Sequence, residues 1–242
     1  SCISDGGASH GFLREPNGTF ITFDIPGSNL TEAHAINPAG QITGMYADQT
    51  AHFEGFLRKK DGSLTTFHVG GAVDTLPWAM NAAGQITGAY EDTSNHVHGF
   101  LRSTGGTLTS FDVAGSTFTF PRGINSAGQI IGDSLDSHGR VHGFLRRVDG
   151  TLTTFDVPGS IATDPRAINP AGQITGNYTD NNGHLHGFLR NGDATITIFD
   201  VPGSMETASE SINPAGQITG FYSVNVLTGR GFIRSPQHRE QD

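Results

Sequence analysis

The stretch Ile-Asn-Pro-Ala-Gly-Gln-Ile-Thr-Gly at residues 168–176 is one of five near-copies along this chain. Its core, Asn-x-Ala-Gly-Gln, recurs every 44 residues, and a tripeptide beginning Gly-Phe recurs with the same period. A fixed period of this length is typical of stacked or ring-closed repeats, each too small to bury a core alone. We number the repeats 1 to 5 by their turn asparagines, which are Asn37, Asn81, Asn125, Asn169 and Asn213.

Four short strands are predicted in each repeat, and residues 165–200 illustrate them. Pro170 and Gly172 suit a tight turn, which separates a first strand at 166–169 from a second at 173–179. A polar turn then leads to a third strand at 185–190, and a β-branched segment at 195–201 forms the fourth. Because a proline at the end of the fourth strand cannot donate to a further ladder, we expect that strand at an exposed edge and the first strand innermost.

Four antiparallel strands repeated around an axis predict an all-β fold, the five-bladed β-propeller. We expect a single domain over residues 1–242 with four-stranded blades. In one blade the N-terminal strands would supply the outer part and residues 209–224 the inner part, which would close the ring. A six-bladed or strand-swapped arrangement is the alternative, because the Gly-Phe strand occurs six times and every other strand five times. Its copies begin at Gly11, Gly55, Gly99, Gly143, Gly187 and Gly231.

The third and fourth strands indicate their own register. If Arg102 pairs with Leu108, then His98 faces Asp112 across the hairpin. Repeat 1 reverses the two types, since a glutamate there faces a histidine, and this covariation supports the register. The last Gly-Phe strand carries Arg230, which could displace the N-terminal copy and pair with an aspartate, or lie outside the ring. The other expected pairs are His10 with Asp24, Glu54 with His68, His142 with Asp156, and His186 with Asp200.

The composition argues against several classes of partner. The chain of 242 residues has a net charge of −9 at pH 7, so a polyanion such as DNA would meet mostly repulsion. No apolar run approaches the roughly 20 residues that cross a bilayer, and no basic-then-apolar leader is present, although one could have been removed. The single cysteine, Cys2, excludes an internal disulfide. We expect a secreted bacterial protein, extracellular or periplasmic, that works as a monomer without nucleic acid or membrane partners.

The repeat also resembles a known family. Residues 168–176 followed by His-Gly-Phe-Leu-Arg at 186–190 are similar to the bacterial extracellular repeat family named for a His-Ala-Phe tripeptide. The resemblance covers nearly the whole chain, although the tripeptide here is His-Gly-Phe, with Glu-Gly-Phe and Arg-Gly-Phe in two copies. It implies an exported repeat protein and supports the propeller fold, but it implies no activity and no catalytic motif.

One position of the repeat varies widely in residue type, whereas the small residue after it and the threonine three places before it change little or not at all. The variable position lies three residues before each turn asparagine, which we interpret as the head of the innermost strand. Five-fold geometry would bring these side chains together near the mouth of an axial funnel, the usual place for a small-molecule site in a ring-shaped fold. A residue that the blade needs should recur, whereas a residue that one central ligand needs should not. The five residues are His34, Trp78, Arg122, Arg166 and Glu210.

These five side chains suit an enzyme. Arg122 and Arg166 could hold a carboxylate or another anion, because a guanidinium binds such groups through two parallel hydrogen bonds. The indole of Trp78 offers a flat face for a sugar ring. His34 and Glu210 could exchange protons as base and acid. The simpler interpretation is that the position is exposed and drifts, with arginine and glutamate pairing across the pore.

Other polar residues are weaker candidates. Glu32 and Asp164 lie two residues before the variable position and could enlarge the site, although loop acids are usually solvated. Histidine pairs such as His184 and His186 share one face of a strand. No repeat supplies the three clustered ligands of a catalytic zinc, so we predict no metal and no cofactor. Ser134 replaces the tyrosine of the other four repeats and has no evident base.

We therefore predict a propeller enzyme that acts on an anionic carbohydrate or a related small molecule at one funnel site. A lyase is favoured over a hydrolase, because neutralising a carboxylate acidifies the adjacent C–H, whereas hydrolysis needs two well-separated carboxyls. The alternative is a lectin-like module with several equivalent inter-blade sites, built from repeated residues such as His98, Asp112 and Tyr90. A third hypothesis is an exported structural repeat protein without a small-molecule ligand.

Overall fold

The computed structural model describes residues 2–3, 8–225 and 228–236. The chain divides into two compact units, Ser1–Asp112 and Val113–Asp242, and each is described by itself. Among the described residues, no helix is long and apolar enough to cross a membrane. That the units form one domain over the whole chain stays a prediction.

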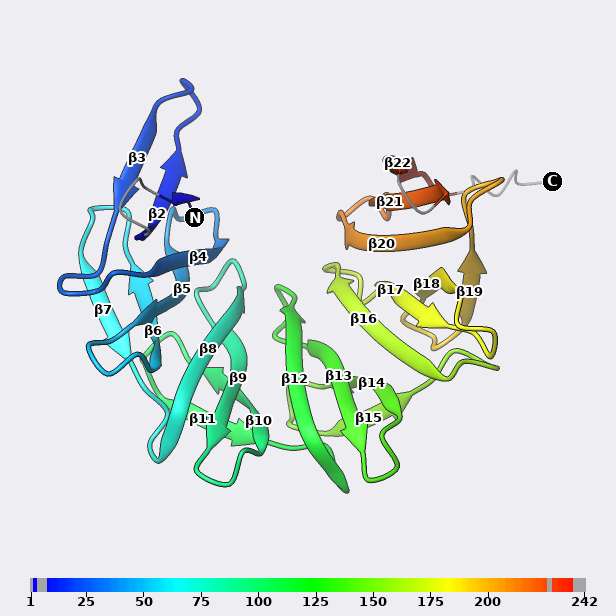
Figure 1. Cartoon of the computed structure of the whole chain (residues 1–242), viewed down its shortest axis with the longest axis horizontal. Coiled ribbons are helices and arrows are strands. Elements are labelled where there is room, and N and C mark those ends of the chain that lie inside the picture. The colour runs from blue at the N-terminus through cyan, green and yellow to red at the C-terminus, as the bar shows by residue number, and fades with distance from the viewer. Residues whose placement is uncertain (1, 4–7, 226–227, 237–242) are drawn as a thin grey trace. The chain divides into compact units, whose positions relative to one another are not determined.

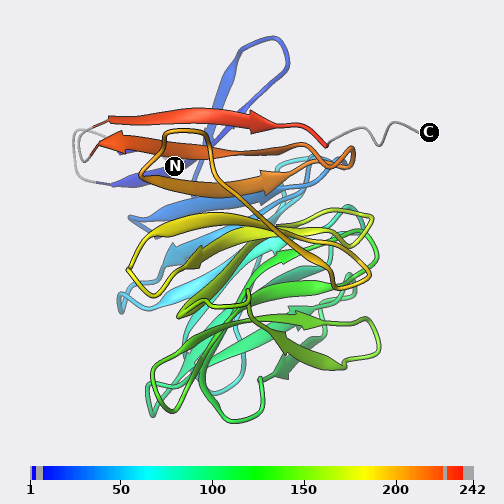
Figure 2. The same ribbon diagram turned by 90° about the vertical axis from the view of Figure 1, so that its right-hand side faces the viewer.

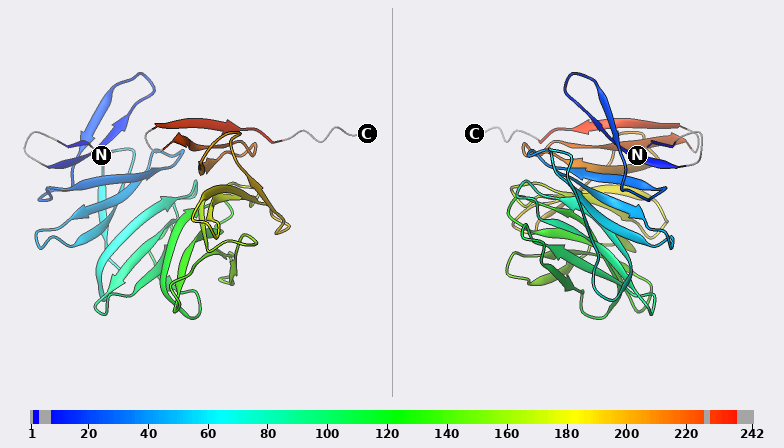
Figure 3. Two further views of the ribbon diagram at one scale, coloured as in Figure 1. Left: turned by 45° about the vertical axis from the view of Figure 1, so that its right-hand side comes forward. Right: turned by 90° about the vertical axis from the view of Figure 1, so that its left-hand side faces the viewer.

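The described strands of unit 1 form three groups of antiparallel neighbours (Figure 1). The first has the order β1-β2-β3, the second β4-β5-β6-β7, and the third joins β8 to β11 in sequence order. The hairpin of β2 and β3 extends away from β4 to β7 at its turn, as both views of Figure 3 show. The strands are β1 (Cys2–Ile3), β2 (Ser9–Arg14), β3 (Phe20–Phe23), β4 (Thr31–Ile36), β5 (Ile42–Ala47), β6 (Phe53–Arg58), β7 (Leu64–Phe67), β8 (Ala72–Met80), β9 (Ile86–Asp92), β10 (Val97–Arg102) and β11 (Leu108–Phe111).

Unit 2 repeats the same arrangement. β12 to β15 and β16 to β19 each follow one another as antiparallel neighbours, and β20, β21 and β22 form a three-stranded sheet (Figure 2). The strands are β12 (Ser116–Ile124), β13 (Ile130–Asp136), β14 (Val141–Arg146), β15 (Leu152–Phe155), β16 (Ala162–Ile168), β17 (Ile174–Thr179), β18 (Leu185–Arg190), β19 (Ile196–Phe199), β20 (Glu206–Ile212), β21 (Ile218–Asn225) and β22 (Thr228–Arg234).

The observed strand boundaries correct part of the prediction. In repeat 4 the third strand is confirmed at Leu185–Arg190, and the fourth is shorter than expected, at Ile196–Phe199. The first strand of this repeat, β16, begins at Ala162 and continues through Pro165, although we expected it to begin at Arg166. Arg166 therefore lies near the end of this strand and not at its head.

The predicted hairpin register is confirmed. Arg102 pairs with Leu108 in the ladder, and His98 Nδ1 lies 2.9 Å from Asp112 Oδ1. In the reversed pair, His68 Nδ1 lies 3.0 Å from Glu54 Oε1. The other expected pairs, His10 with Asp24, His142 with Asp156 and His186 with Asp200, lie at 2.8 to 3.0 Å.

The phenylalanine of the Gly-Phe strand forms the centre of the core. Phe56, Phe100 and Phe188 are fully buried. Phe188 clusters with Ile131 of repeat 3 and with Val157, which follows the fourth strand of that repeat. The core therefore lies between consecutive sheets, and a repeat buries its apolar face against its neighbour, as expected for repeats that cannot fold alone.

The turn asparagines join consecutive repeats by hydrogen bonds. Asn169 Oδ1 accepts from the backbone N–H of Gln173 at 3.0 Å, and Asn169 Nδ2 donates to Gln173 Oε1 at 2.9 Å. The same Nδ2 lies 3.2 Å from the carbonyl oxygen of Asn213 in the next repeat. Asn125 contacts the Asn169 carbonyl in the same way at 3.2 Å. The recurrent asparagine is therefore explained by structure.

The surplus Gly-Phe strand has a defined place. It is β22, which pairs with β21 so that Phe232 faces Gly220, and it occupies the third position of the last sheet. The N-terminal Gly-Phe strand, β2, instead pairs with β1 and β3, and its His10 takes Asp24 as partner. The number of blades, the shared blade and the closure of the ring stay predictions.

Candidate functional site

All five variable residues lie at β-bulges. In the first strand of each repeat the ladder slips by one residue, so that the register skips the variable position. In repeat 4, Pro165 faces Gly176 and Ala167 faces Thr175, which leaves Arg166 between two pairs. The corresponding slips lie between Ala33 and Ala35, Pro77 and Ala79, Pro121 and Gly123, and Ser209 and Ser211.

A glycine opposite each bulge makes this geometry possible. A methyl group on Gly176 would overlap the carbonyl oxygen of Asp164, and one on Gly132 would overlap that of Phe120. The glycine of the Ile-Thr-Gly segment thus lets the bulged strand approach closely. Bulges re-aim a side chain out of the ladder, and they are frequent beside functional sites. The equivalent glycines of the other repeats are Gly44, Gly88 and Gly220.

In unit 2 two bulged arginines carry ion pairs. Arg122 Nε on β12 lies 2.7 Å from Oδ1 of Asp133, a buried aspartate on the adjacent strand β13. Arg166 Nη2 lies 2.6 Å from Asp164 Oδ2 on the same strand, β16. Each contact engages one nitrogen of a guanidinium that has five N–H donors, so both arginines retain donors for a ligand.

Asp164 has the most perturbed environment of this cluster. Burial is the main cause that raises its pKa to about 6. The positive charges of Arg166 and Arg122 lower this pKa, and the negative charges of Asp133 and Glu210 raise it further. Its Oδ1 is buried and accepts no hydrogen bond from the described residues. A carboxyl with a pKa close to neutral can both take up and release a proton, which is the requirement for a general acid or base.

Glu210 is held near this cluster by its neighbour in the chain. Ser209 is buried; its backbone N–H donates to Asn177 Oδ1 at 2.6 Å, and its hydroxyl donates to the Gly176 carbonyl at 2.5 Å. These bonds fix β20 against β17 just before the bulge. Glu210 itself is exposed and lies close enough to Asp164 to raise the pKa of that carboxyl.

In unit 1 the two predicted residues contact each other. The imidazole of His34 stacks on the indole of Trp78 with ring centres 4.5 Å apart and planes 7° from parallel. His34 Nδ1 lies 2.7 Å from the carbonyl oxygen of Pro77, which can only accept, so this nitrogen carries the hydrogen. His34 Nε2 lies 3.6 Å from Glu32 Oε2. One face of Trp78 is thus covered by the histidine, and only the other could stack on a sugar.

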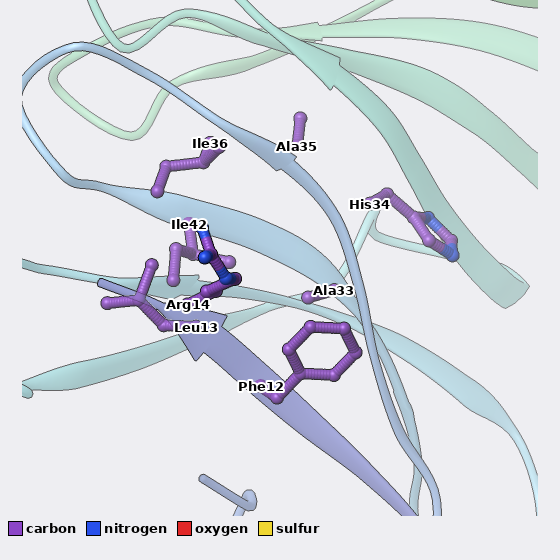
Figure 4. Close-up of a pocket in the computed structure, with 8 residues that line it drawn as sticks. All are labelled: Phe12, Leu13, Arg14, Ala33, His34, Ala35, Ile36 and Ile42. Atoms are coloured by element: carbon purple, nitrogen blue, oxygen red, sulfur yellow. The ribbon is translucent and has the colours of Figure 1, made fainter. Parts of the chain in front are cut away.

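A cleft of about 260 Å³ lies beside His34 (Figure 4). Phe12, Leu13 and Arg14 of β2 line one side, and residues 33–36 of β4 line the other. The ring of His34 points away from Leu13 and Arg14. The imidazole nitrogens of His34 therefore lie toward Pro77 and Glu32, and apolar side chains of β2, β4 and β5 form most of the cleft lining.

The structure brings the predicted residues together in two groups. His34 and Trp78 belong to unit 1, whereas Arg122, Arg166 and Glu210 belong to unit 2. Convergence of all five at one funnel stays a prediction. Among the described residues, no three His, Cys, Asp or Glu side chains gather as metal ligands.

Two members of the unit 2 cluster lie outside the five variable positions. Asp164 was a weaker candidate because we expected it in a loop, and Asp133 was not a candidate. A usable signal existed, because the residue after the bulge-facing glycine also varies from repeat to repeat. It is Met45, Ala89, Asp133, Asn177 and Phe221.

The fold, but not the sequence, is similar to known proteins. No family model and no curated protein matches the chain. Virginiamycin B lyase from Staphylococcus aureus, substituted with selenomethionine, matches with a TM-score of 0.62 at 12% identity, over 96% of this chain and 82% of that chain. A catalytically inactive histidine-to-alanine variant of that lyase with quinupristin gives 0.60 at 14%, over 98% and 84%. A proposed TolB from Agrobacterium tumefaciens gives 0.62 at 13%, over 90% and 80%.

These similarities define the fold class. At such low identities a shared fold carries no information about substrate or catalytic residues. The protein is all-β and propeller-like, which confirms the predicted fold class at that level. The expectation of the His-Ala-Phe repeat family has support in the fold only, since no family model matches.

Proposed function

We propose that this protein is an enzyme that acts on an anionic carbohydrate or a related small molecule, by elimination. The observation that carries the proposal is Asp164, a carboxyl with a pKa of about 6 between two arginines at neighbouring bulges. A base, an anion-binding pair and an acid on non-repeated positions are the groups that elimination beside a carboxylate requires.

The proposed step uses groups of unit 2. Arg122 and Arg166 donate hydrogen bonds to the carboxylate of the substrate, which acidifies the C–H next to it. Asp164 accepts that proton, a C=C bond forms, and the C–O bond to the leaving group breaks with its electron pair going to oxygen. Glu210 protonates the leaving oxygen. His34 is kept as an alternative base, as predicted from the sequence.

The decisive experiment measures turnover of uronate-containing oligosaccharides by the ultraviolet absorbance of the unsaturated product. Asp164→Asn is expected to lower kcat at least 100-fold, within the range of about 10² to 10⁴ that general acid–base groups contribute. Glu206→Gln, an exposed carboxylate on β20, serves as the matched control and should retain activity. Full activity of Asp164→Asn, or unchanged binding after both Arg122→Ala and Arg166→Ala, would contradict the proposal.

A lectin-like function remains the second candidate, because the His–acid pairs and the Tyr–His stacks recur with the same geometry. Tyr90 stacks on His98 at 4.9 Å and Tyr178 stacks on His186 at 5.0 Å. Equivalent surfaces would give several weak sites per chain. Calorimetry with an acidic oligosaccharide distinguishes the two functions: one site per chain supports the enzyme, and several equivalent sites support the lectin.

A further inference from the structure

Repeat 3 lacks a tyrosine that repeats 2 and 4 place against a histidine. In repeats 2 and 4 this tyrosine pairs across the ladder with the histidine of the Gly-Phe strand and stacks on it. Its ring also packs against the cluster that contains a valine from the preceding repeat, Val69 for Tyr90 and Val157 for Tyr178. In repeat 3 the paired residues are Ser134 and His142, so the ladder is kept and the aromatic ring is missing.

The missing ring leaves a cleft. Its volume is about 170 Å³, and its lining includes Val113, Ser134, His142 and Thr154. Ser134 is 1% exposed, so it forms the floor of the cleft. In another protein an engineered apolar cavity of about 150 Å³ holds one benzene molecule, so this space suits a single six-membered ring.

The histidine keeps its orientation without its stacking partner. His142 Nδ1 lies 3.0 Å from Asp156, and its Nε2 lies 3.3 Å from Asp136. The corresponding distances for His98 are 2.9 Å to Asp112 and 3.3 Å to Asp92. Carboxylates at both nitrogens therefore hold the imidazole of His142 in the orientation that His98 has in repeat 2, where a tyrosine stacks on it. The face of His142 is therefore preset for an aromatic ring.

A hydrogen-bonding partner for a phenol hydroxyl is also in place. In repeat 1 the hydroxyl of Tyr46 makes a side-chain hydrogen bond with Thr66. The equivalent residue of repeat 3 is Thr154, which is exposed and lines the cleft. A phenol in the cleft would thus find the stacking surface and the apolar wall that repeats 2 and 4 offer to their tyrosines, together with the hydroxyl partner that repeat 1 offers to Tyr46.

We propose that this cleft is a binding site for one para-substituted phenol ring, stacked on His142, packed against Val113 and hydrogen-bonded to Thr154. The site lies wholly in unit 2 and uses none of the residues of the Asp164 cluster. It would take a free phenolic compound or a tyrosine side chain of a peptide, since both present the same ring and hydroxyl. The proposal does not depend on the proposed enzyme activity.

The test uses p-cresol, which is the tyrosine side chain without its backbone. Calorimetry and the melting temperature of the whole chain are measured with and without it. We expect one p-cresol per chain and, at ten times the dissociation constant, a rise in Tm of about 3–5 °C. Toluene, which lacks the hydroxyl, is expected to bind at least three-fold more weakly; equal binding of toluene would overturn the assignment of Thr154.

Matched variants test the location. Ser134→Tyr should fill the cleft, raise Tm and abolish p-cresol binding. Tyr178→Ser should open a cleft in repeat 4 that has Ile198 in place of Thr154, and so give a second, weaker site that binds toluene as well as p-cresol. Unchanged binding in Ser134→Tyr would overturn the proposal, as would binding by Tyr178→Ser alone with none in the natural chain.

A second pair of variants keeps the test valid if Ser134→Tyr does not fold. His142→Ala should weaken p-cresol binding about ten-fold. His186→Ala, in which the altered histidine is already covered by Tyr178, should leave the binding unchanged. Equal effects of the two substitutions would overturn the assignment of His142. A peptide containing one tyrosine, compared with its phenylalanine analogue, distinguishes a peptide ligand from a free phenol.

Discussion

The hairpins of the third and fourth strands keep the same types of side-chain pair from repeat to repeat, whereas the bulges of the first strands do not. In the hairpins each side chain has a partner across the ladder, and His98 with Asp112 is matched by a reversed Glu54 with His68. At the bulges the ladder skips one residue, and the side chain there ranges from tryptophan to glutamate. A residue that the ladder register skips is not constrained by backbone pairing, which makes its side chain available for chemistry.

The largest effect is expected from removing the close approach that permits a bulge. Gly176→Ala places a methyl group against the carbonyl oxygen of Asp164, so the two strands must separate. We expect the free energy of unfolding to fall by about 3 kcal/mol or more, as for severe overpacking. Urea denaturation measures it. Gly70, which has no atom within 4 Å of an added Cβ, supplies the control Gly70→Ala, and an equal cost in both variants would disprove the role of the bulge.

The second largest loss of stability is expected from replacing a turn asparagine. Asn169 is 1% exposed and bonds both to its own turn and to the carbonyl of Asn213. Asn169→Ala leaves buried partners unsatisfied, and we expect a loss of about 2–3 kcal/mol in the free energy of unfolding. Asn213→Ala is the comparison, because Asn213 is exposed. Its replacement should lower the free energy of unfolding by only about 1 kcal/mol. Reversed magnitudes in urea denaturation would show that the bond between repeats contributes little.

The ionised carboxylate of Asp164, in the charged cluster of unit 2, is expected to lower the stability of the folded protein. The folded-state pKa of Asp164, about 6, lies above the ordinary value near 3.9, so the folded protein holds this proton more tightly. Stability due to this group therefore falls as pH rises from about 4 to about 6 and stays lower above. Asp164→Asn is expected to stabilise the protein by about 1–2 kcal/mol at pH 7.5 and hardly at pH 4.

Thermal or urea unfolding at the two pH values checks this expectation. Asp133→Asn provides the contrast, because Asp133 is buried in an ion pair with Arg122 and its loss should destabilise the protein at pH 7.5. A destabilising Asp164→Asn at pH 7.5 would mean that the carboxylate serves the fold.

The smallest effect is expected in the exposed hairpin ladder. Burial lowers the pKa of His98, but hydrogen bonds and charge attraction from Asp112 and Asp92 outweigh this and raise it. The stabilisation from this pair is therefore complete at low pH and disappears as pH rises through the folded-state pKa of the histidine. A double-mutant cycle of His98→Ala and Asp112→Ala should give about 0.5–1 kcal/mol at pH 6 and less at pH 9. A coupling that is equal at both pH values would contradict this account.

The sequence could predict what depends on local pattern and on pairing between adjacent strands. The period, the strand types and the His98–Asp112 register all follow from one strand and its neighbour. The bulge at Arg166 could not be predicted, because it depends on where two strands slip past each other. Pro165 made the prediction worse: a proline usually argues against a strand interior, yet at a bulge it occupies a place in the ladder that needs no donor.

The candidate site was predicted only in part for a related reason. Variation between repeats singled out Arg122 and Arg166, and both lie at bulges and form ion pairs. It gave no information on their partners. Asp133 and the burial of Asp164 depend on contacts between strands and between repeats, and these become visible only when the innermost strand is placed against its neighbours.

The hydrogen bonds between successive turn asparagines determine where the chain tolerates changes in length. Asn125 donates to the carbonyl of Asn169, and Asn169 to that of Asn213, so the spacing between these turns is shared by neighbouring repeats. Added residues at the Asn-x-Ala-Gly-Gln turns would break contacts on both sides. The polar turn at 180–183 has no such role, and its exposed tip can lengthen without disturbing the neighbouring repeat. Evolution or design can therefore insert short segments at the 180–183 turn, whereas the asparagine turns accept only the addition or removal of a complete repeat.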